Sequence, residues 1–129
     1  MSATNRGGER IDQDAYFTPH AFTYGIAPFL FGGAGERYRR SPIVDPACGN
    51  GQILQPFARL GFDPAQLFGF ELNPVLAGEA GETTGARVVV CDTLAACAGW
   101  RPSCPVSIVM NPPYSLAFDF VKWAVAVAA

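Results

Sequence analysis

The sequence predicts an α/β fold, a Rossmann-like, doubly wound sheet of mainly parallel strands. Short apolar segments alternate along the chain with longer helical patterns, and such alternation implies crossover connections between parallel strands. The expected strands are apolar almost throughout, which is typical of a sheet covered by helices on both faces. The length of 129 residues, half of them hydrophobic, fits a single domain with a core of its own.

The N-terminal part precedes this alternation. Residues 1–13 are polar and mixed in charge, and we expect a flexible arm there. Residues 14–19, DAYFTP, predict a turn whose final proline opens a helix over residues 20–31. The glycine-rich and basic residues 32–41 then predict a loop or a helix end.

Four strands and four further helices are expected from the alternation. The strands cover residues 43–45, 67–72, 86–91 and 106–110, and the helices cover residues 50–60, 74–83, 93–98 and 115–129. Asn73 and Ser115 are the expected N-caps of two of these helices, with Pro74 in the first turn after Asn73. Doubly wound sheets commonly hold about five to seven strands. We therefore expect an incomplete sheet of about four strands, with residues 14–129 forming the N-terminal part of the domain.

Composition limits the classes of function. The formal net charge is −2, so no overall basic character indicates nucleic acid, although local basic patches can coexist with an acidic total. The four cysteines, Cys48, Cys91, Cys97 and Cys104, form no C-x-x-C pair, which argues against zinc and favours free thiols. No signal peptide and no apolar run of about 18 residues is present, so we expect a cytoplasmic protein without a membrane partner.

A polar side chain follows each expected strand. Asp45, Glu71, Asp92 and Asn111 stand at these four positions. Because ligands of doubly wound sheets bind outside the carboxyl ends of the strands, we expect these side chains to face one crevice. Polar residues are common at strand ends, but a full set of four is less readily a matter of chance.

The loop after the first strand has the sequence DPACGNG, residues 45–51. Gly49 and Gly51 allow a tight turn and close approach of a ligand to the backbone. Asp45 and a proline stand where a dinucleotide-binding loop has its first glycine. A carboxylate at this point repels a pyrophosphate and attracts a cation such as the ammonium group of an amino acid. The alternative is a plain turn between a strand and a helix.

The other two carboxylates, Glu71 and Asp92, indicate further groups of the expected ligand. Glu71 can accept hydrogen bonds from both ribose hydroxyls, and Asp92 can accept one from the exocyclic amine of adenine. Glu71 has the alternative of a solvated or capping side chain, and Asp92 the stronger alternative of capping the helix expected after it. A ligand with an ammonium end, a ribose and an adenine but no phosphate matches S-adenosylmethionine.

The segment after the fourth strand is Asn111, Pro112, Pro113 and Tyr114. Asn111 provides a side-chain carbonyl acceptor, and the two prolines fix φ and hold the neighbouring carbonyl groups in place. Tyr114 provides a flat apolar face with a polar tip. This combination is suited to holding a planar amino group, the alternative being a strand that ends in a Pro-Pro turn.

The order DAYFTP, DPACGNG, FGFELNP, VVVCDTL, NPPY resembles the S-adenosylmethionine-dependent amino-methyltransferases, most closely the DNA N6-adenine type. The resemblance covers about residues 14–125 and implies a methyltransferase-type Rossmann-like fold, S-adenosylmethionine as cofactor and adenine in DNA as substrate. It is typical of phage or restriction-modification enzymes. The later strands of that family and its target-recognition domain have no counterpart in this sequence.

The resemblance also implies a role for each matching residue. Tyr16, Thr18 and Pro19 would close over the methionine part of the cofactor, which Asp45, Pro46, Ala47, Gly49 and Gly51 would hold. Glu71 would bind the ribose, Leu72 would pack on the adenine ring, and Asp92 with Thr93 would bind the adenine edge. The target base would be held by Asn111, Pro112, Pro113 and Tyr114, with Asn111 also close to the cofactor. No metal is implied.

Two alternatives remain from the sequence. NPPY also occurs in families similar to glutamine N5-methyltransferases of release factors and guanine-amino methyltransferases of rRNA. The Tyr-x-Thr-Pro element favours DNA over these substrates. The other alternative is a non-catalytic remnant that binds S-adenosylmethionine or folds only in part.

Overall fold

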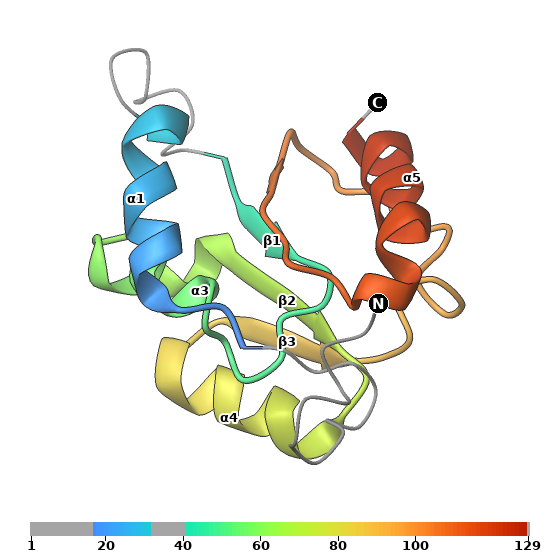
Figure 1. The fold of residues 1–129 in the computed structure, drawn as a ribbon, viewed down its shortest axis with the longest axis horizontal. Coiled ribbons are helices and arrows are strands. Elements are labelled where there is room, and N and C mark those ends of the chain that lie inside the picture. Colours follow the sequence, from blue (N-terminus) through green and yellow to red (C-terminus); the bar gives the residue numbers. More distant parts are fainter. Residues whose placement is uncertain (1–16, 32–40, 129) are drawn as a thin grey trace.

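The computed structural model describes residues 17–31 and 41–128, so the expected arm (residues 1–13) and Tyr16 lie outside the described residues. Figure 1 shows a central sheet with helices on both sides. In chain order the elements are α1 (His20–Phe31), β1 (Ile43–Asp45), α3 (Leu54–Arg59), the 3-10 turn η3 (Pro64–Gln66), β2 (Leu67–Glu71), α4 (Pro74–Thr84), β3 (Arg87–Val90), β4 (Ser107–Ile108), the 3-10 turn η4 (Tyr114–Leu116) and α5 (Ala117–Ala128).

The four strands form one parallel sheet in the order β3-β2-β1-β4. Val44 of β1 pairs with Phe68 of β2 on one side and with Ile108 of β4 on the other. This confirms the predicted parallel sheet. The chain moves outward from β1 to β2 and β3, then returns to place β4 on the other side of β1. The strand order therefore reverses between β1 and β4, the place at which doubly wound sheets bind ligands.

Two apolar layers pack on the sheet, one on each face. Neighbouring residues of β1 point to opposite faces, so Ile43 belongs to one layer and Val44 to the other. The first layer contains Phe57 of α3 and Ala80 of α4, whereas the second contains Trp123 of α5. Helices on both faces explain why the strands are apolar on both sides, and they confirm the doubly wound class.

Local sequence explains the bounds of α4. Asn73 is its N-cap, as predicted, and its Oδ1 accepts hydrogen bonds from the backbone N–H groups of Val75 and Leu76 at 2.9 and 3.3 Å. Pro74 occupies the first turn, where its missing N–H costs nothing. The helix ends at Gly85, whose φ of 71° is the left-handed conformation typical of a helix C-terminus.

Two predicted helices differ from the structure. The helix expected over residues 50–60 begins only at Leu54, because the loop before it contains Gly49 and Gly51 with φ of 54° and 94°, outside the helical range. The helix expected over residues 93–98 is absent and a series of turns replaces it. There the carbonyl of Asp92 accepts hydrogen bonds from three successive N–H groups, of Ala95 at 3.2 Å, Ala96 at 2.8 Å and Cys97 at 3.4 Å. This closes a turn instead of extending a helix.

The last strand and helix also differ in their bounds. The strand expected over residues 106–110 is assigned only at Ser107–Ile108. The two prolines that follow, Pro112 and Pro113, have no N–H with which to continue the ladder. Ser115, the expected cap, lies inside η4, and Pro113 is the residue that precedes this turn. The helix α5 then starts at Ala117.

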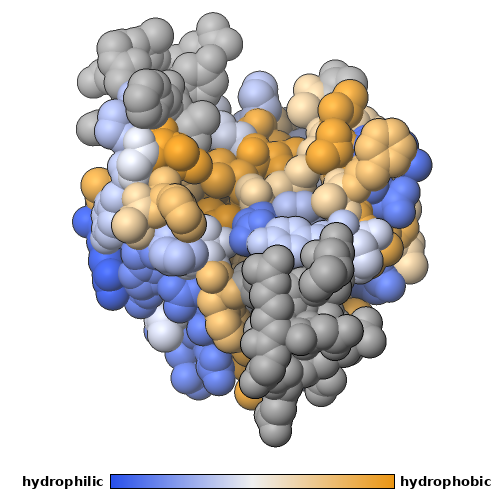
Figure 2. All heavy atoms as spheres, viewed as in Figure 1, coloured by the Kyte–Doolittle hydropathy of each residue, from blue (hydrophilic) through white to orange (hydrophobic). Residues whose placement is uncertain are grey.

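The surface between α1 and α5 is largely apolar. In Figure 2 apolar side chains gather between these two helices, on the side of the sheet that carries β4. Phe22 and Ile26 of α1 and Val121 and Val125 of α5 are among the exposed large apolar residues. None of the helices in the two described ranges has the length and apolar character needed to cross a membrane.

Candidate functional site

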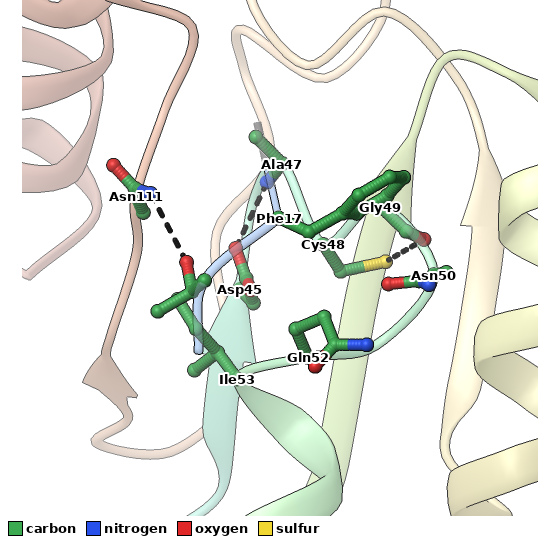
Figure 3. Close-up of a pocket in the computed structure, with 10 residues that line it drawn as sticks. Phe17, Asp45, Ala47, Cys48, Gly49, Asn50, Gln52, Ile53 and Asn111 are labelled. Carbon is green, nitrogen blue, oxygen red and sulfur yellow. Dashed lines mark hydrogen bonds between the residues drawn. The ribbon is translucent and has the colours of Figure 1, made fainter. Parts of the chain in front are cut away.

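A pocket lies at the carboxyl end of β1, where the strand order reverses (Figure 3). Three separate segments line it: the residues before α1, the glycine loop after β1 and the segment after β4. Its lining is Phe17, Thr18, Asp45, Ala47, Cys48, Gly49, Asn50, Gln52, Ile53 and Asn111. The empty space, including the open mouth, is about 240 Å³.

Asp45 is the carboxylate of this pocket and is almost fully buried, with 1% of its surface exposed. Its Oδ1 accepts a hydrogen bond from the Ala47 backbone N–H at 3.1 Å. The pKa of Asp45 is raised to about 7, because burial and, to a smaller extent, the nearby Glu71 charge outweigh the Ala47 hydrogen bond, which lowers it. A carboxyl with such a pKa gains from a cationic ligand, which stabilises its ionised form.

The glycine loop is held at several points. The Gly49 backbone N–H donates to Glu71 Oε2 at 2.8 Å, and the Cys48 N–H donates to the Phe70 carbonyl at 3.0 Å. Gly51 packs so closely on α4 that an added Cβ would lie 3.2 Å from the Ala80 Cα, in a backbone conformation with φ of 94°. A side chain at position 51 is therefore disfavoured both by contact and by φ.

Glu71 connects this loop to the end of β2. Its Oε2 accepts from Gly49, and its Oε1 accepts from the Asn73 backbone N–H at 3.1 Å. A carboxylate has about four lone-pair positions, so acceptor capacity remains for the hydroxyl groups predicted from the sequence. Leu72, beside it, is 48% exposed and offers an apolar surface at the same sheet edge.

Asp92 and Thr93 follow β3 and organise the turn after it. Asp92 Oδ1 accepts from the backbone N–H groups of Leu94 and Ala95 at 3.1 and 3.3 Å, which is the capping role considered as the alternative. Thr93 is buried, and its hydroxyl donates to the Pro46 carbonyl at 2.6 Å. This hydrogen bond joins the turn after β3 to the glycine loop after β1. The adenine contact of both residues remains a prediction.

Asn111 reaches the pocket from the end of β4. Its Nδ2 donates to Thr18 Oγ1 at 3.0 Å, so the segment before α1 and the segment after β4 meet at the pocket. In Figure 3 the Asn111 amide lies across the pocket from Gly49 and Asn50. The structure therefore places the residue predicted to hold the target amine beside the loop predicted to hold the cofactor.

Five lining residues were not among those predicted from the sequence: Phe17, Cys48, Asn50, Gln52 and Ile53. Phe17 is 51% exposed, and its ring would lie 3.9 Å from a Cβ added at Gly49. Asn50 has a buried Oδ1 without a hydrogen-bond partner. A buried acceptor without a partner is costly, so Asn50 fits a ligand that brings a donor such as an ammonium group. Asn50 is part of the loop DPACGNG, but nothing in the sequence indicates that its side chain, and not another in the loop, faces the ligand.

The remaining predicted residues lie around the pocket and not in its lining. Pro112 and Pro113 are half-buried behind Asn111, and Tyr114 is 61% exposed in η4. The structure thus brings together Thr18, Asp45, Ala47, Gly49 and Asn111, and it leaves outside the lining Pro19, Pro46, Gly51, Glu71, Leu72, Asp92, Thr93, Pro112, Pro113 and Tyr114. Within residues 17–31 and 41–128, no group of three or more His, Cys, Asp or Glu side chains is arranged to hold a metal ion.

Comparisons with known proteins place the fold. No family model matches the chain, and no curated protein matches it at a significant level. Among solved structures, the protein 1320 of Thermoplasma acidophilum has a TM-score of 0.57 at 21% identity, covering 81% of this chain and 52% of its own. TrmN from Thermus thermophilus has a TM-score of 0.51 at 21% identity, covering 78% of this chain and 34% of its own.

A third match is a TehB-like SAM-dependent methyltransferase from Corynebacterium glutamicum, with a TM-score of 0.43, 28% identity, and coverage of 55% of this chain and 36% of its own. The chain thus spans between about a third and a half of the length of these three structures. At these identities the likeness to the first two shows the fold, a Rossmann-like α/β fold with a parallel sheet.

Proposed function

We propose that this chain carries the cofactor pocket and the amine-holding loop of an S-adenosylmethionine-dependent methyltransferase, whose substrate is the exocyclic N6 amine of adenine in DNA. The observation that carries the proposal is the shared pocket of Asn111 and the glycine loop. An acceptor for an amine and an acidic pocket for a cationic ligand adjoin at the strand-order reversal.

The pocket supports a cofactor with an amino-acid end. Asp45 is a buried carboxyl whose pKa is raised to about 7, and Asn50 Oδ1 is a buried acceptor without a partner. Both would hold the ammonium group of the methionine part. Glu71 and the exposed Leu72 would hold the ribose and the face of the adenine ring. S-adenosylmethionine, when bound, supplies an electrophilic methyl group on sulfur.

The loop after β4 would orient the amine that receives the methyl group. An exocyclic aromatic amine is a poor nucleophile because its lone pair is delocalised into the ring. Asn111 Oδ1 and the Pro112 carbonyl would each accept one N–H of the amine, which favours a pyramidal nitrogen and directs its lone pair. This contribution is one of orientation and electrostatics and needs no general base.

Tyr114 would hold the target base beside the amine. The residue is 61% exposed in η4, three residues beyond Asn111, and its ring offers a surface on which a planar base can stack. In a duplex the target atom is inaccessible, so an enzyme of this kind takes the base out of the helix and reads it in a pocket. Stacking on Tyr114 would hold the displaced base while Asn111 binds its amino group.

The first experiment measures cofactor binding and methyl transfer separately. The purified protein is titrated with S-adenosylmethionine by calorimetry, then incubated with tritium-labelled cofactor and adenine-containing DNA. We expect Asn111→Ala to lower transfer at least a hundredfold while cofactor affinity changes only a few-fold. Val125→Ala, on the exposed face of α5, is the control and should leave both unchanged.

A panel of substrates tests the choice of DNA. Duplex DNA, ribosomal RNA and a release factor are each offered with labelled cofactor, and label on adenine N6 of DNA is the expected result. Label on the RNA or on the glutamine of the release factor would overturn the DNA substrate but retain the amino-methyltransferase. Folded protein that shows no heat of binding with S-adenosylmethionine would overturn the whole proposal.

A further inference from the structure

Two cysteines outside the pocket lining lie in contact with each other. The Sγ atoms of Cys91 and Cys97 are 2.9 Å apart. Cys91 directly follows β3, and Cys97 lies in the turns that come next. Both residues are half-buried, whereas Cys48 is buried and Cys104 is exposed.

We propose that Cys91 and Cys97 form a redox-active dithiol site, which closes to an intramolecular disulfide by exchange with a low-molecular-weight disulfide such as oxidised glutathione. The proposal is independent of the methyltransferase function. It stands on the contact between the two sulfur atoms and on the anchoring of the segment between them.

The geometry requires little movement. A disulfide bond is about 2.05 Å long, so the two sulfur atoms, now 2.9 Å apart, need to approach by less than 1 Å. The backbone on both sides is already fixed. The Cys91 N–H donates to the Glu71 carbonyl at 3.0 Å, and the Trp123 Nε1–H donates to the Cys97 carbonyl at 3.1 Å.

The turn between the two cysteines is closed by its own hydrogen bonds. The Asp92 carbonyl accepts from the Ala96 N–H at 2.8 Å, and Asp92 Oδ1 accepts from Leu94 and Ala95. These bonds bring Cys97 back to the end of β3. The loop that a disulfide would close is therefore formed already in the dithiol state.

The exchange proceeds in two steps that balance. The Cys97 thiolate attacks the low-molecular-weight disulfide, which forms a mixed disulfide at Cys97 and releases one small thiolate. This thiolate takes the proton of Cys91 and becomes a thiol. The Cys91 thiolate then attacks the Cys97 sulfur, which forms the Cys91–Cys97 bond and releases the second small thiolate, which takes a proton from water. Overall the protein dithiol is oxidised by two electrons, and one small disulfide is reduced to two thiols.

The order of the two steps follows from the environment of Cys91. The pKa of Cys91 is raised to about 12, first by burial and then by the neighbouring Cys97 sulfur and the Asp92 charge. Cys91 is therefore a thiol at neutral pH and a poor first nucleophile, because the thiolate is the attacking species. In the second step, which is intramolecular, the close contact of Cys91 with Cys97 compensates for the small fraction of Cys91 thiolate.

The disulfide would hold in place a turn that contacts both the glycine loop and α5. Thr93, inside the closed loop, donates to the Pro46 carbonyl, and Cys97 accepts from Trp123 of α5. Both contacts persist only while the turn keeps its shape. Since a disulfide restricts the unfolded chain and holds this turn closed, the oxidised protein should unfold at a higher temperature than the reduced protein.

The test uses the protein with Cys104→Ser, which removes the exposed thiol. This variant is incubated with oxidised glutathione, then alkylated, digested and analysed by mass spectrometry. We expect a peptide pair linked through Cys91 and Cys97 that dithiothreitol separates again. The matched control, with Cys91→Ser added, should instead retain glutathione at Cys97. Stable glutathione adducts in place of the linked pair in the Cys104→Ser protein would overturn the proposal.

Thermal unfolding gives a second readout. Oxidised Cys104→Ser protein should melt at a temperature several degrees above the reduced form, and the further variant Cys97→Ser should lose this difference. Equal melting temperatures for the oxidised and reduced forms, with the crosslink present, would overturn the inference that the disulfide stabilises the turn.

Discussion

Asn111 Nδ2 donates a hydrogen bond to Thr18 Oγ1 over 3.0 Å, between residues 93 positions apart in the sequence. A side-chain amide has a donor end and an acceptor end, and in this structure the donor end faces Thr18, whose hydroxyl accepts. The Oδ1 of Asn111 is thereby turned away from Thr18 and left to accept another hydrogen bond. Thr18 thus acts, in the proposed function, by orienting the acceptor that would hold the target amine.

Thr18→Val tests this orientation with little change in side-chain volume. Without the hydroxyl acceptor, the Asn111 amide is free to rotate, and we expect methyl transfer to fall about tenfold, equivalent to about 1.4 kcal/mol. The measurement is the single-turnover rate of transfer to DNA at saturating cofactor. Thr18→Ser keeps the hydroxyl and is expected to retain the rate. A Val variant as fast as the Ser variant would show that Thr18 does not position Asn111.

Asp45 gives the protein a specific dependence of stability on pH. Its folded pKa of about 7 lies above the ordinary value of 3.8, because burial disfavours the charge. The folded state therefore binds more protons than the unfolded state between these values. The free energy of unfolding is expected to fall as pH rises through this window, by at most about 1.4 kcal/mol per pH unit for this one group.

Urea denaturation at a series of pH values from about 4 to about 8, which spans the Asp45 titration, measures this dependence. Asp45→Asn keeps an oxygen for the Ala47 N–H but carries no charge. The variant is expected to match the original protein at the acid end and to exceed it in stability at the alkaline end. Parallel pH profiles for the two proteins would contradict a raised pKa for Asp45.

The fold could be predicted from the sequence because the sheet depends on apolar periodicity, and all four strands and the helices α1 and α4 are found where that pattern places them. The turns after β3 could not, since the hydrogen bonds of Asp92 that end the helical pattern depend on the backbone geometry around it. The positions of Phe17 and Asn50 in the pocket lining depend on tertiary packing, so the sequence pattern could not predict them. The contact between Cys91 and Cys97 likewise depends on this turn, because their spacing alone resembles no metal or redox motif.

Gly69, in the middle of β2, is expected to tolerate no side chain. A Cβ at this position would lie 2.7 Å from Cys48 Sγ and 3.1 Å from Cys48 Cβ. Gly69→Ala should therefore destabilise the protein by about 1–3 kcal/mol, the usual cost of overpacking. Chemical denaturation measures this loss, and Gly69→Ala with Cys48→Ala should recover part of it, because the Sγ contact is removed. No recovery in the double variant would assign the cost to another contact.

Thr93 is expected to couple the stability of the turn after β3 to the cofactor loop. Its buried hydroxyl donates to the carbonyl of Pro46, a buried residue, at 2.6 Å. Thr93→Val keeps the shape but leaves that carbonyl without its partner, at a cost of about 1–3 kcal/mol. Because Pro46 follows Asp45 directly, the same change should weaken binding of S-adenosylmethionine by about threefold to tenfold, measured by calorimetry under conditions where the variant is fully folded. Thr93→Ser restores the donor and should recover both stability and affinity. If Thr93→Val loses stability but binds the cofactor as tightly as the Ser variant, the hydrogen bond stabilises the fold without shaping the pocket.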